Sequence, residues 1–169
     1  MKMRTIGIVL AAACGLSPAF AQNPITPQAA FEKLTSLAGE WQGVVRGNEG
    51  TPTTVVYRLT ANNSVILETL FPGERHEMVT AYHLNGNQLM LTHYCAAKNQ
   101  PQMALDPQST DEKLIFVFSG GTNLNPAIDE HVHNLRIKWV SWDAIESEWD
   151  GYKDGKKVET TTFVLTRKK

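Results

Sequence analysis

Two short segments, "THYC" (92–95) and "HVH" (131–133), carry the side chains best suited to chemistry. A cysteine beside a histidine can serve as a nucleophile with its base. His93 and Cys95 lie two residues apart, so on a strand they share a face with α-carbons roughly 6.5–7 Å apart. The sequence offers no identifiable orienting carboxylate or oxyanion hole. We therefore interpret Cys95 as a small buried hydrophobic residue rather than a nucleophile.

The "HVH" segment suggests a metal site. His131 and His133 can reach one ion from the same side of a strand, and such pairs occur in zinc, iron and copper sites. A third ligand would come from His93, His76 or Cys95. The alternative is a set of hydrogen-bonded pocket histidines without metal. We favour it, because the spacing alone does not make the ligands converge.

Strand periodicity predicts where these side chains point. One face of the predicted strand 130–141 holds two histidines and three apolar residues: His131, His133, Leu135, Ile137 and Trp139. The other face holds Arg136 and Lys138, which favour water. Since side chains alternate along a strand, we expect both histidines and Trp139 to face the interior.

The Asn85-Gly86 pair predicts a two-residue hairpin turn. In that register Met78 lies opposite His93, and His76 lies opposite Cys95. The shared face would hold His76, Met78, Thr80, Tyr82, Leu84, Leu89, Leu91, His93 and Cys95. This face is mostly apolar, so we expect it to be internal. Several polar groups inside one barrel predict a cavity, because an unpaired buried polar group costs about 1–3 kcal/mol.

Turn residues separate one helical segment from many short alternating runs. Thr26, Pro27 and Gly39 suit the cap, first turn and end of a helix over 26–39. The predicted strands are 40–47, 53–60, 64–71, 75–84, 87–95, 101–106, 113–119, 130–141, 145–152 and 157–167. About ten hairpin-linked strands predict an all-β, antiparallel up-and-down barrel, with a β-sandwich as the alternative.

The first 21 residues have the pattern of a signal peptide. Lys2 and Arg4 precede a short apolar run, and "AFA" ends it, so we expect cleavage after Ala21 and a periplasmic or secreted protein with one domain over 22–169. A lipoprotein anchored through Cys14 is the less favoured alternative. Cleavage leaves Cys95 without an internal disulfide partner.

Charge and hydropathy narrow the choice of partners. Without Lys2 and Arg4, 14 basic and 17 acidic residues remain, for a net charge of about −3. No basic stripe is present, which argues against a nucleic-acid partner. No other apolar run approaches the roughly 20 residues of a transmembrane span.

The segment "LAGEWQG" (37–43) resembles the Gly-x-Trp signature of the calycins, which include lipocalins, fatty-acid-binding proteins and nitrobindin-type barrels. The resemblance implies that Trp41 closes the barrel floor and that Arg167 on the last strand packs across it. The order of "LAGEW", "THYC", "NQP", "HVH" and "DGK" is also similar to a group of bacterial exported lipocalin-like proteins. A nitrobindin-type haem ligand would lie near the C-terminal strands, where no histidine follows His133.

We therefore predict an exported barrel that binds a small, partly apolar molecule. Its polar anchors would be His93, His131, His133, His76 and Tyr82, with Cys95 and Trp139 in the same interior. A divalent metal or haem on His93, His131 and His133 is the first alternative. An enzyme in the cavity and a filled, purely structural barrel are the others. Glu68 shares a face with Ile66 and Leu70, so if buried it needs a partner such as Arg46, Arg58 or a histidine.

Overall fold

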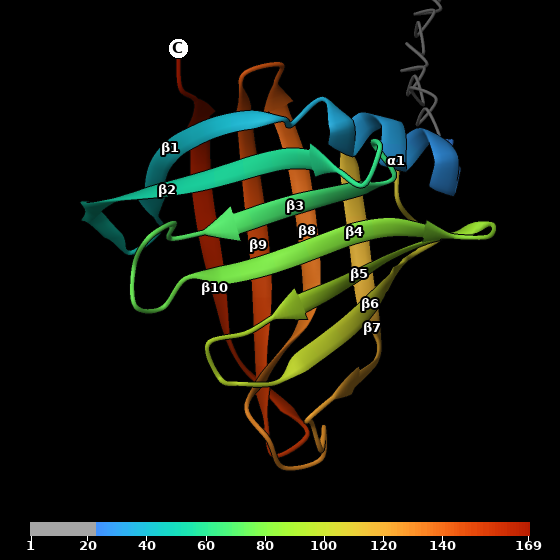
Figure 1. The fold of residues 1–169 in the computed structure, drawn as a ribbon. Coiled ribbons are helices and arrows are strands. Elements are labelled where there is room, and N and C mark those ends of the chain that lie inside the picture. Colours follow the sequence, from blue (N-terminus) through green and yellow to red (C-terminus); the bar gives the residue numbers. More distant parts are fainter. Residues whose placement is uncertain (1–22) are drawn as a thin grey trace, which may run out of the picture.

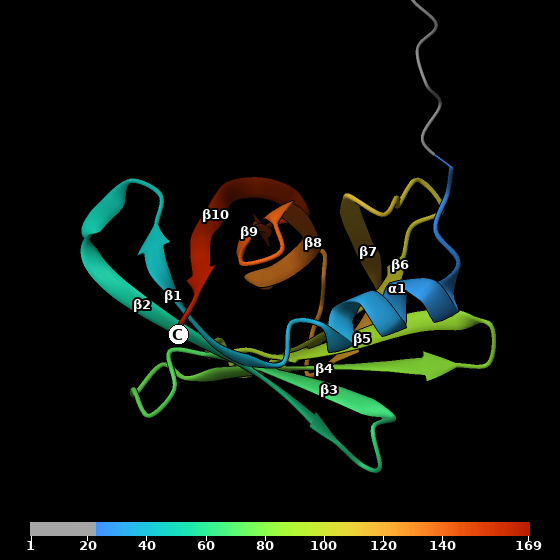
Figure 2. The same cartoon turned by 90° about the horizontal axis from the view of Figure 1, so that it is seen from above.

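In the computed structural model, residues 23–169 form a closed barrel of ten antiparallel strands with one helix at an end (Figures 1 and 2). The elements are α1 (Pro27–Thr35), β1 (Gly39–Val45), β2 (Asn48–Thr60), β3 (Val65–Leu70), β4 (Met78–Asn85), β5 (Gln88–Tyr94), β6 (Gln100–Leu105), β7 (Lys113–Thr122), β8 (His131–Ser141), β9 (Ala144–Lys153) and β10 (Lys156–Arg167). The prediction of an all-β, up-and-down barrel is confirmed. The predicted signal peptide and Cys14 lie outside the described residues.

The barrel closes where the first strand meets the last. Each strand pairs with its neighbour in the chain, and β1 then pairs with β10 from Trp41–Arg167 to Val45–Phe163. Gly43 lies in this seam, where an added Cβ would sit 1.9 Å from the Val164 carbonyl oxygen. The close approach of the two backbones therefore requires glycine at this position.

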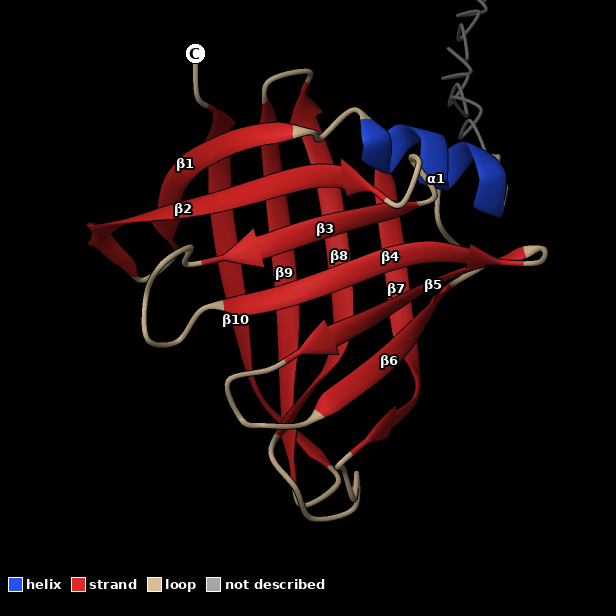
Figure 3. Ribbon diagram, viewed as in Figure 1, coloured by secondary structure: helices blue, strands red, loops and turns tan. Residues whose placement is uncertain are grey.

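Helix α1 covers part of one end of the barrel and packs against β4 and β5 (Figure 3). The Ala29 N–H donates to the Thr26 hydroxyl at 3.2 Å, and Pro27 occupies the first turn, as predicted. The helix ends at Thr35, earlier than the predicted Gly39, and a turn leads into β1. None of the described helical segments is long and apolar enough to cross a membrane.

The α1 end of the barrel is closed by Trp41 and Arg167. Trp41 is fully buried, and its indole N–H donates to the Leu37 carbonyl oxygen at 2.7 Å. The Arg167 guanidinium lies 4.4 Å from the centroid of the indole ring. It also donates to the carbonyl oxygens of Ala38 and Ser36 at 2.9 and 2.7 Å. This is the arrangement that the resemblance to calycins implies, and it leaves the floor tightly packed.

The β4–β5 register differs from the predicted one by two residues. Leu84 lies opposite Leu89, so the turn is Gly86-Asn87 and not Asn85-Gly86. Gly86 then has a φ of +59° at the first turn position, where type II′ turns favour glycine. A shift of two residues preserves the faces. His76 is the exception, because it lies before β4 and is exposed beside Glu74.

Candidate functional site

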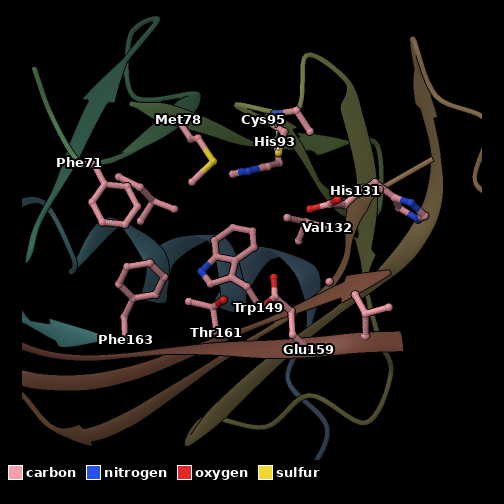
Figure 4. A pocket seen from close by; sticks show the side chains of 15 residues that line it. Phe71, Met78, His93, Cys95, His131, Val132, Trp149, Glu159, Thr161 and Phe163 are labelled. Atoms are coloured by element: carbon pink, nitrogen blue, oxygen red, sulfur yellow. Dashed lines mark hydrogen bonds between the residues drawn. The ribbon is translucent and has the colours of Figure 1, made fainter. Parts of the chain in front are cut away.

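A cavity of about 300 Å³ lies at the end of the barrel opposite α1 (Figure 4). Its walls are mostly apolar, and the loops after β5 and before β8 border it together with the start of β10. The lining comprises Leu70, Phe71, Met78, His93, Cys95, Ala97, Glu130, His131, Val132, Trp149, Gly151, Val158, Glu159, Thr161 and Phe163. The strand ends on this side therefore surround a hollow, whereas the ends at α1 surround packed side chains.

His93 is the central polar residue of the cavity. Its imidazole points inward between Met78 and Trp149, with its ring centroid 4.9 Å from that of Trp149 (Figure 4). Nδ1 lies 2.9 Å from the Thr80 hydroxyl oxygen, and among the described residues Nε2 has no hydrogen-bond partner. Burial lowers the pKa of His93 to about 4. The ring is therefore neutral near pH 7 and leaves one nitrogen unpaired at the cavity.

Trp149 contributes a second unpaired polar atom. The residue is 4 % exposed, and its indole N–H finds no acceptor within residues 23–169. Thr53, Asn99 and Ser147 each bury one atom in the same condition, but none of them lines the cavity. Native proteins leave few such atoms unpaired, so two around one cavity mark it as a place where a ligand can supply the missing bonds.

A row of four polar side chains crosses the inner wall from β2 to β5. We call Tyr57, Glu68, Thr80 and His93 the polar row, since each lies directly opposite the next in the strand pairing. The hydroxyls of Tyr57 and Tyr82 donate to the two carboxylate oxygens of Glu68, at 2.8 and 2.5 Å. The row connects His93 at the cavity to a carboxylate deep in the core.

Glu68 has hydrogen-bonding tyrosines as partners, where the sequence predicted an ion pair. Arg46 instead pairs with Glu146 at 3.0 Å, and its side chain is exposed. Burial raises the pKa of Glu68 from 4.5 to about 7, although the hydrogen bonds to the carboxylate lower it. Burial and the nearby carboxylate also raise the pKa of both tyrosines. The ion-pair prediction was wrong because hydroxyl donors satisfy the carboxylate without burying a cation.

His131 is buried and lines the cavity, but its imidazole does not have the predicted inward orientation. A β-bulge in β8 leaves His133 without a partner, while Val132 lies opposite Gly151 and His131 opposite Tyr152. The extra residue changes the alternation. Val132 therefore points into the cavity, and the His131 imidazole points away from it (Figure 4).

The two imidazoles contact each other on the other side of the strand. His131 Nε2 lies 3.0 Å from His133 Nδ1, and His131 Nδ1 lies 2.8 Å from the Asp129 carbonyl oxygen. The His133 ring stacks between Phe118 and Tyr152, at centroid distances of 4.5 and 3.9 Å. These contacts give both imidazoles hydrogen-bond and stacking partners within the barrel wall. His131 therefore borders the cavity only through its backbone side.

The metal site predicted from His93, His131 and His133 is not assembled, because the His131 imidazole points away from the cavity that His93 lines. Across residues 23–169, no three His, Cys, Asp or Glu side chains are grouped so that they could hold a metal ion. The cavity, at about 300 Å³, is at the lower limit of roughly 300–1,000 Å³ for small-molecule pockets. This size fits a one- or two-ring molecule.

The other predicted site residues are dispersed. Cys95 lines the cavity, and burial raises the pKa of its thiol, which opposes a nucleophilic role. Tyr82 is buried on Glu68 and does not reach the cavity. His76 is exposed outside the strands, and Trp139 lies at the α1 end under the Lys33 ammonium group.

Several cavity residues were absent from the predicted site, notably Trp149, Phe71, Met78, Thr161 and Phe163. The sequence carried a signal for most of them, since Met78 was placed on an inner face, and Thr161 and Phe163 alternate with Thr160 and Thr162 along the predicted last strand. Trp149 likewise shares a face with Ile145 and Ser147. What the sequence lacked was the pairing that brings β9 and β10 opposite β5.

Comparisons with known proteins give no family for this chain. Neither a scan against protein-family models nor a search among curated proteins found a match. Any proposal for the function of this protein therefore depends on the closed ten-stranded barrel and on the geometry of its cavity.

Proposed function

We propose that this protein is an exported, lipocalin-like barrel that binds a small, partly apolar molecule in the cavity opposite α1. One observation carries the proposal: His93 and Trp149 both line the cavity, and each has a buried side-chain nitrogen, Nε2 and Nε1, that is unpaired within the described chain. Each such atom costs about 1–3 kcal/mol. A ligand that bonded to them would recover part of that cost.

The walls supply the rest of the binding energy. Phe71, Met78, Trp149 and Phe163 present apolar surface on several sides of the cavity. Removing apolar surface from water contributes about 25 cal/mol per Å². Pockets that bind small molecules combine such walls with a few polar groups that fix orientation. A purely structural barrel would be expected to fill this space, as it does at Trp41.

The binding function is tested by native mass spectrometry of the freshly purified protein and by calorimetric titration with naphthalene. Val132→Phe adds an aromatic ring at a side chain that points into the cavity, and we expect naphthalene binding to be lost. Val140→Phe is the matched control, because Val140 is exposed on β8. Equal binding by both variants would contradict the proposal, as would a protein that neither retains a small molecule nor binds naphthalene.

Export is part of the proposal and has its own test. We expect the protein recovered from the periplasm or medium to begin at Gln22, because the pattern before it ends in "AFA". Intact-mass measurement gives the cleavage position. A lipid-modified Cys14, or an uncleaved chain in the cytoplasm, would contradict this cleavage.

A further inference from the structure

The charged side chains in the cavity wall are all acidic. Glu130 and Glu159 line the cavity, whereas no lysine or arginine of the described chain does. The His93 imidazole adds no charge near pH 7, because burial lowers its pKa to about 4. A charged group on a bound molecule would therefore meet carboxylates in the wall and no cationic side chain. Such a wall attracts cations and repels anions.

Glu159 lies on the inner face of β10. Side chains alternate along a strand, and Thr161 and Phe163, which have the same parity as Glu159, also line the cavity. Thr160 points to the other face, where its hydroxyl donates to Asp150 at 2.8 Å. The inner face of the last strand thus ends in a carboxylate at the mouth of the cavity.

A glycine on the neighbouring strand leaves room for this side chain. Gly151 lies opposite Glu159 in the strand pairing. A Cβ added to Gly151 would sit 3.0 Å from Glu159 Cγ and 3.3 Å from Oε1. The Glu159 side chain therefore lies against the bare backbone of β9, and it rises from β10 toward Trp149 (Figure 4).

The Glu159 carboxylate has no hydrogen-bond or ion-pair partner within residues 23–169. The neighbouring lysines pair elsewhere: Lys157 Nζ lies 2.7 Å from Asp150 Oδ1, and Lys153 Nζ lies 3.9 Å from Glu130 Oε2. Glu159 is exposed, so water hydrates its charge at the mouth. This carboxylate is therefore available to a ligand, whereas the charge of Glu130 is partly offset by Lys153.

The cavity behind Glu159 has independent marks of a binding site. The His93 imidazole is 1 % exposed, points into the cavity and leaves Nε2 unpaired among the described residues. The rings of Phe71, Trp149 and Phe163 line the same space. Aromatic faces attract cations and also cover apolar surface. An ammonium group at the mouth could pair with Glu159 and keep part of its hydration, which avoids the large cost of burying a charge.

Resting on the proposed binding function, we propose that the cavity selects small organic cations, in which a one- or two-ring apolar body carries an ammonium group that pairs with Glu159. The apolar body lies among the aromatic rings, and the charge stays at the mouth. The sign of the charge then discriminates between molecules of similar size and shape.

Calorimetric titration near pH 7 with three probes of similar size tests this selection. The probes are 2-naphthylmethylamine, 2-naphthylmethanol and 2-naphthoate, which are a cation, a neutral molecule and an anion. We expect the amine to bind about fivefold more tightly than the alcohol, as one solvent-accessible ion pair allows. The naphthoate should bind more weakly than the alcohol, because it meets only like charge in the wall.

A matched pair of variants tests the role of Glu159. Glu159→Gln keeps the size of the side chain and removes its charge, so the preference for the amine over the alcohol should fall to about twofold or less. Glu32→Gln removes one exposed negative charge from α1, at the opposite end of the barrel, and should retain the full preference.

The outcomes separate the two proposals. If the three probes bind with similar affinity, or the naphthoate binds most tightly, selection of cations is wrong and apolar binding stands. If the preference for the amine survives Glu159→Gln unchanged, or falls equally in Glu32→Gln, Glu159 is not the anchor. If none of the three probes binds, the binding function and its selectivity both fail.

Discussion

Trp41 and Trp149 are buried indoles at opposite ends of one barrel, and their surroundings differ. Trp41 donates to the Leu37 carbonyl oxygen and is covered by the Arg167 guanidinium. Trp149 faces a cavity, and in the described part of the chain its N–H has no acceptor. The same residue type is thus fully satisfied where the barrel is closed and incompletely satisfied where it is hollow. Packing at the first end supports stability, and the unpaired N–H at the second end supports the proposed ligand site.

The largest expected effect comes from truncating the two indoles. Trp41→Ala should lower the free energy of unfolding by about 3–5 kcal/mol, the usual cost of deleting a large core aromatic residue. Trp149→Ala should cost less, because one side of that ring already borders empty space. Urea unfolding of both variants measures the difference. A loss at Trp149 as large as the loss at Trp41 would remove the proposed contrast in packing.

The pH dependence of stability tests Glu68, the buried carboxylate of the polar row. The pKa of Glu68 is about 7 in the folded protein and near 4.5 when unfolded. The folded state therefore keeps a proton that the unfolded state releases, and stability decreases as the pH rises from 4.5 to 7. The shift corresponds to about 3 kcal/mol. Glu68→Gln should abolish this component, so its stability relative to the wild type should rise with pH.

Denaturation of wild type and Glu68→Gln at pH values between 4 and 8 tests this expectation. The exposed helix residue Glu32 supplies the control, since Glu32→Gln should run parallel to the wild type. A pH dependence that is the same in all three proteins would show that Glu68 has an ordinary pKa.

Replacing each tryptophan by phenylalanine isolates the hydrogen bond. Trp41→Phe leaves the buried Leu37 carbonyl oxygen without its indole donor. We expect the free energy of unfolding to fall by about 1–3 kcal/mol. Trp149→Phe removes an N–H that has no acceptor among the described residues, so its effect should be smaller by at least the hydrogen-bond contribution. Thermal unfolding compares the pair. Equal losses would mean that Trp149 has a partner comparable to Leu37.

The smallest effects are expected from enlarging a valine at each end. Val55 lies opposite Trp41 and is fully buried, so Val55→Met should overpack the floor and cost about 1–3 kcal/mol. Val132→Met extends into the cavity and should change stability by less than about 1 kcal/mol, in the stabilising direction. Unfolding midpoints give the sign. Destabilisation by Val132→Met would indicate that the space is already filled.

Local alternation predicted the strands well, because each of them has a buried and an exposed face. All ten predicted strands are present, and the inner positions of Thr80, Tyr82, Leu89, Leu91 and His93 are confirmed. The two-residue register difference at Gly86 left these side chains on the predicted inner face. Trp41 and Arg167 were identified from a resemblance and not from spacing.

The candidate site was less predictable, because it depends on pairing between distant strands. In "HVH" the sequence allows either Val132 or the two histidines to face the interior, since valine suits an inner face as well as histidine does. Only the pairing of Val132 with Gly151 reveals the bulge. The partners of Glu68 come from β2 and β4, and no local pattern indicates that tyrosines would replace a cation.

The seam between β1 and β10 also has a consequence for how the chain folds. Trp41 pairs with Arg167, so the strand pairing that closes the barrel joins residues separated by almost the whole domain. Contacts of such high sequence separation slow folding, because loop-closure entropy is lost before they form. Nine strands can pair as an open sheet, but the barrel cannot close until the C-terminal strand has been synthesised.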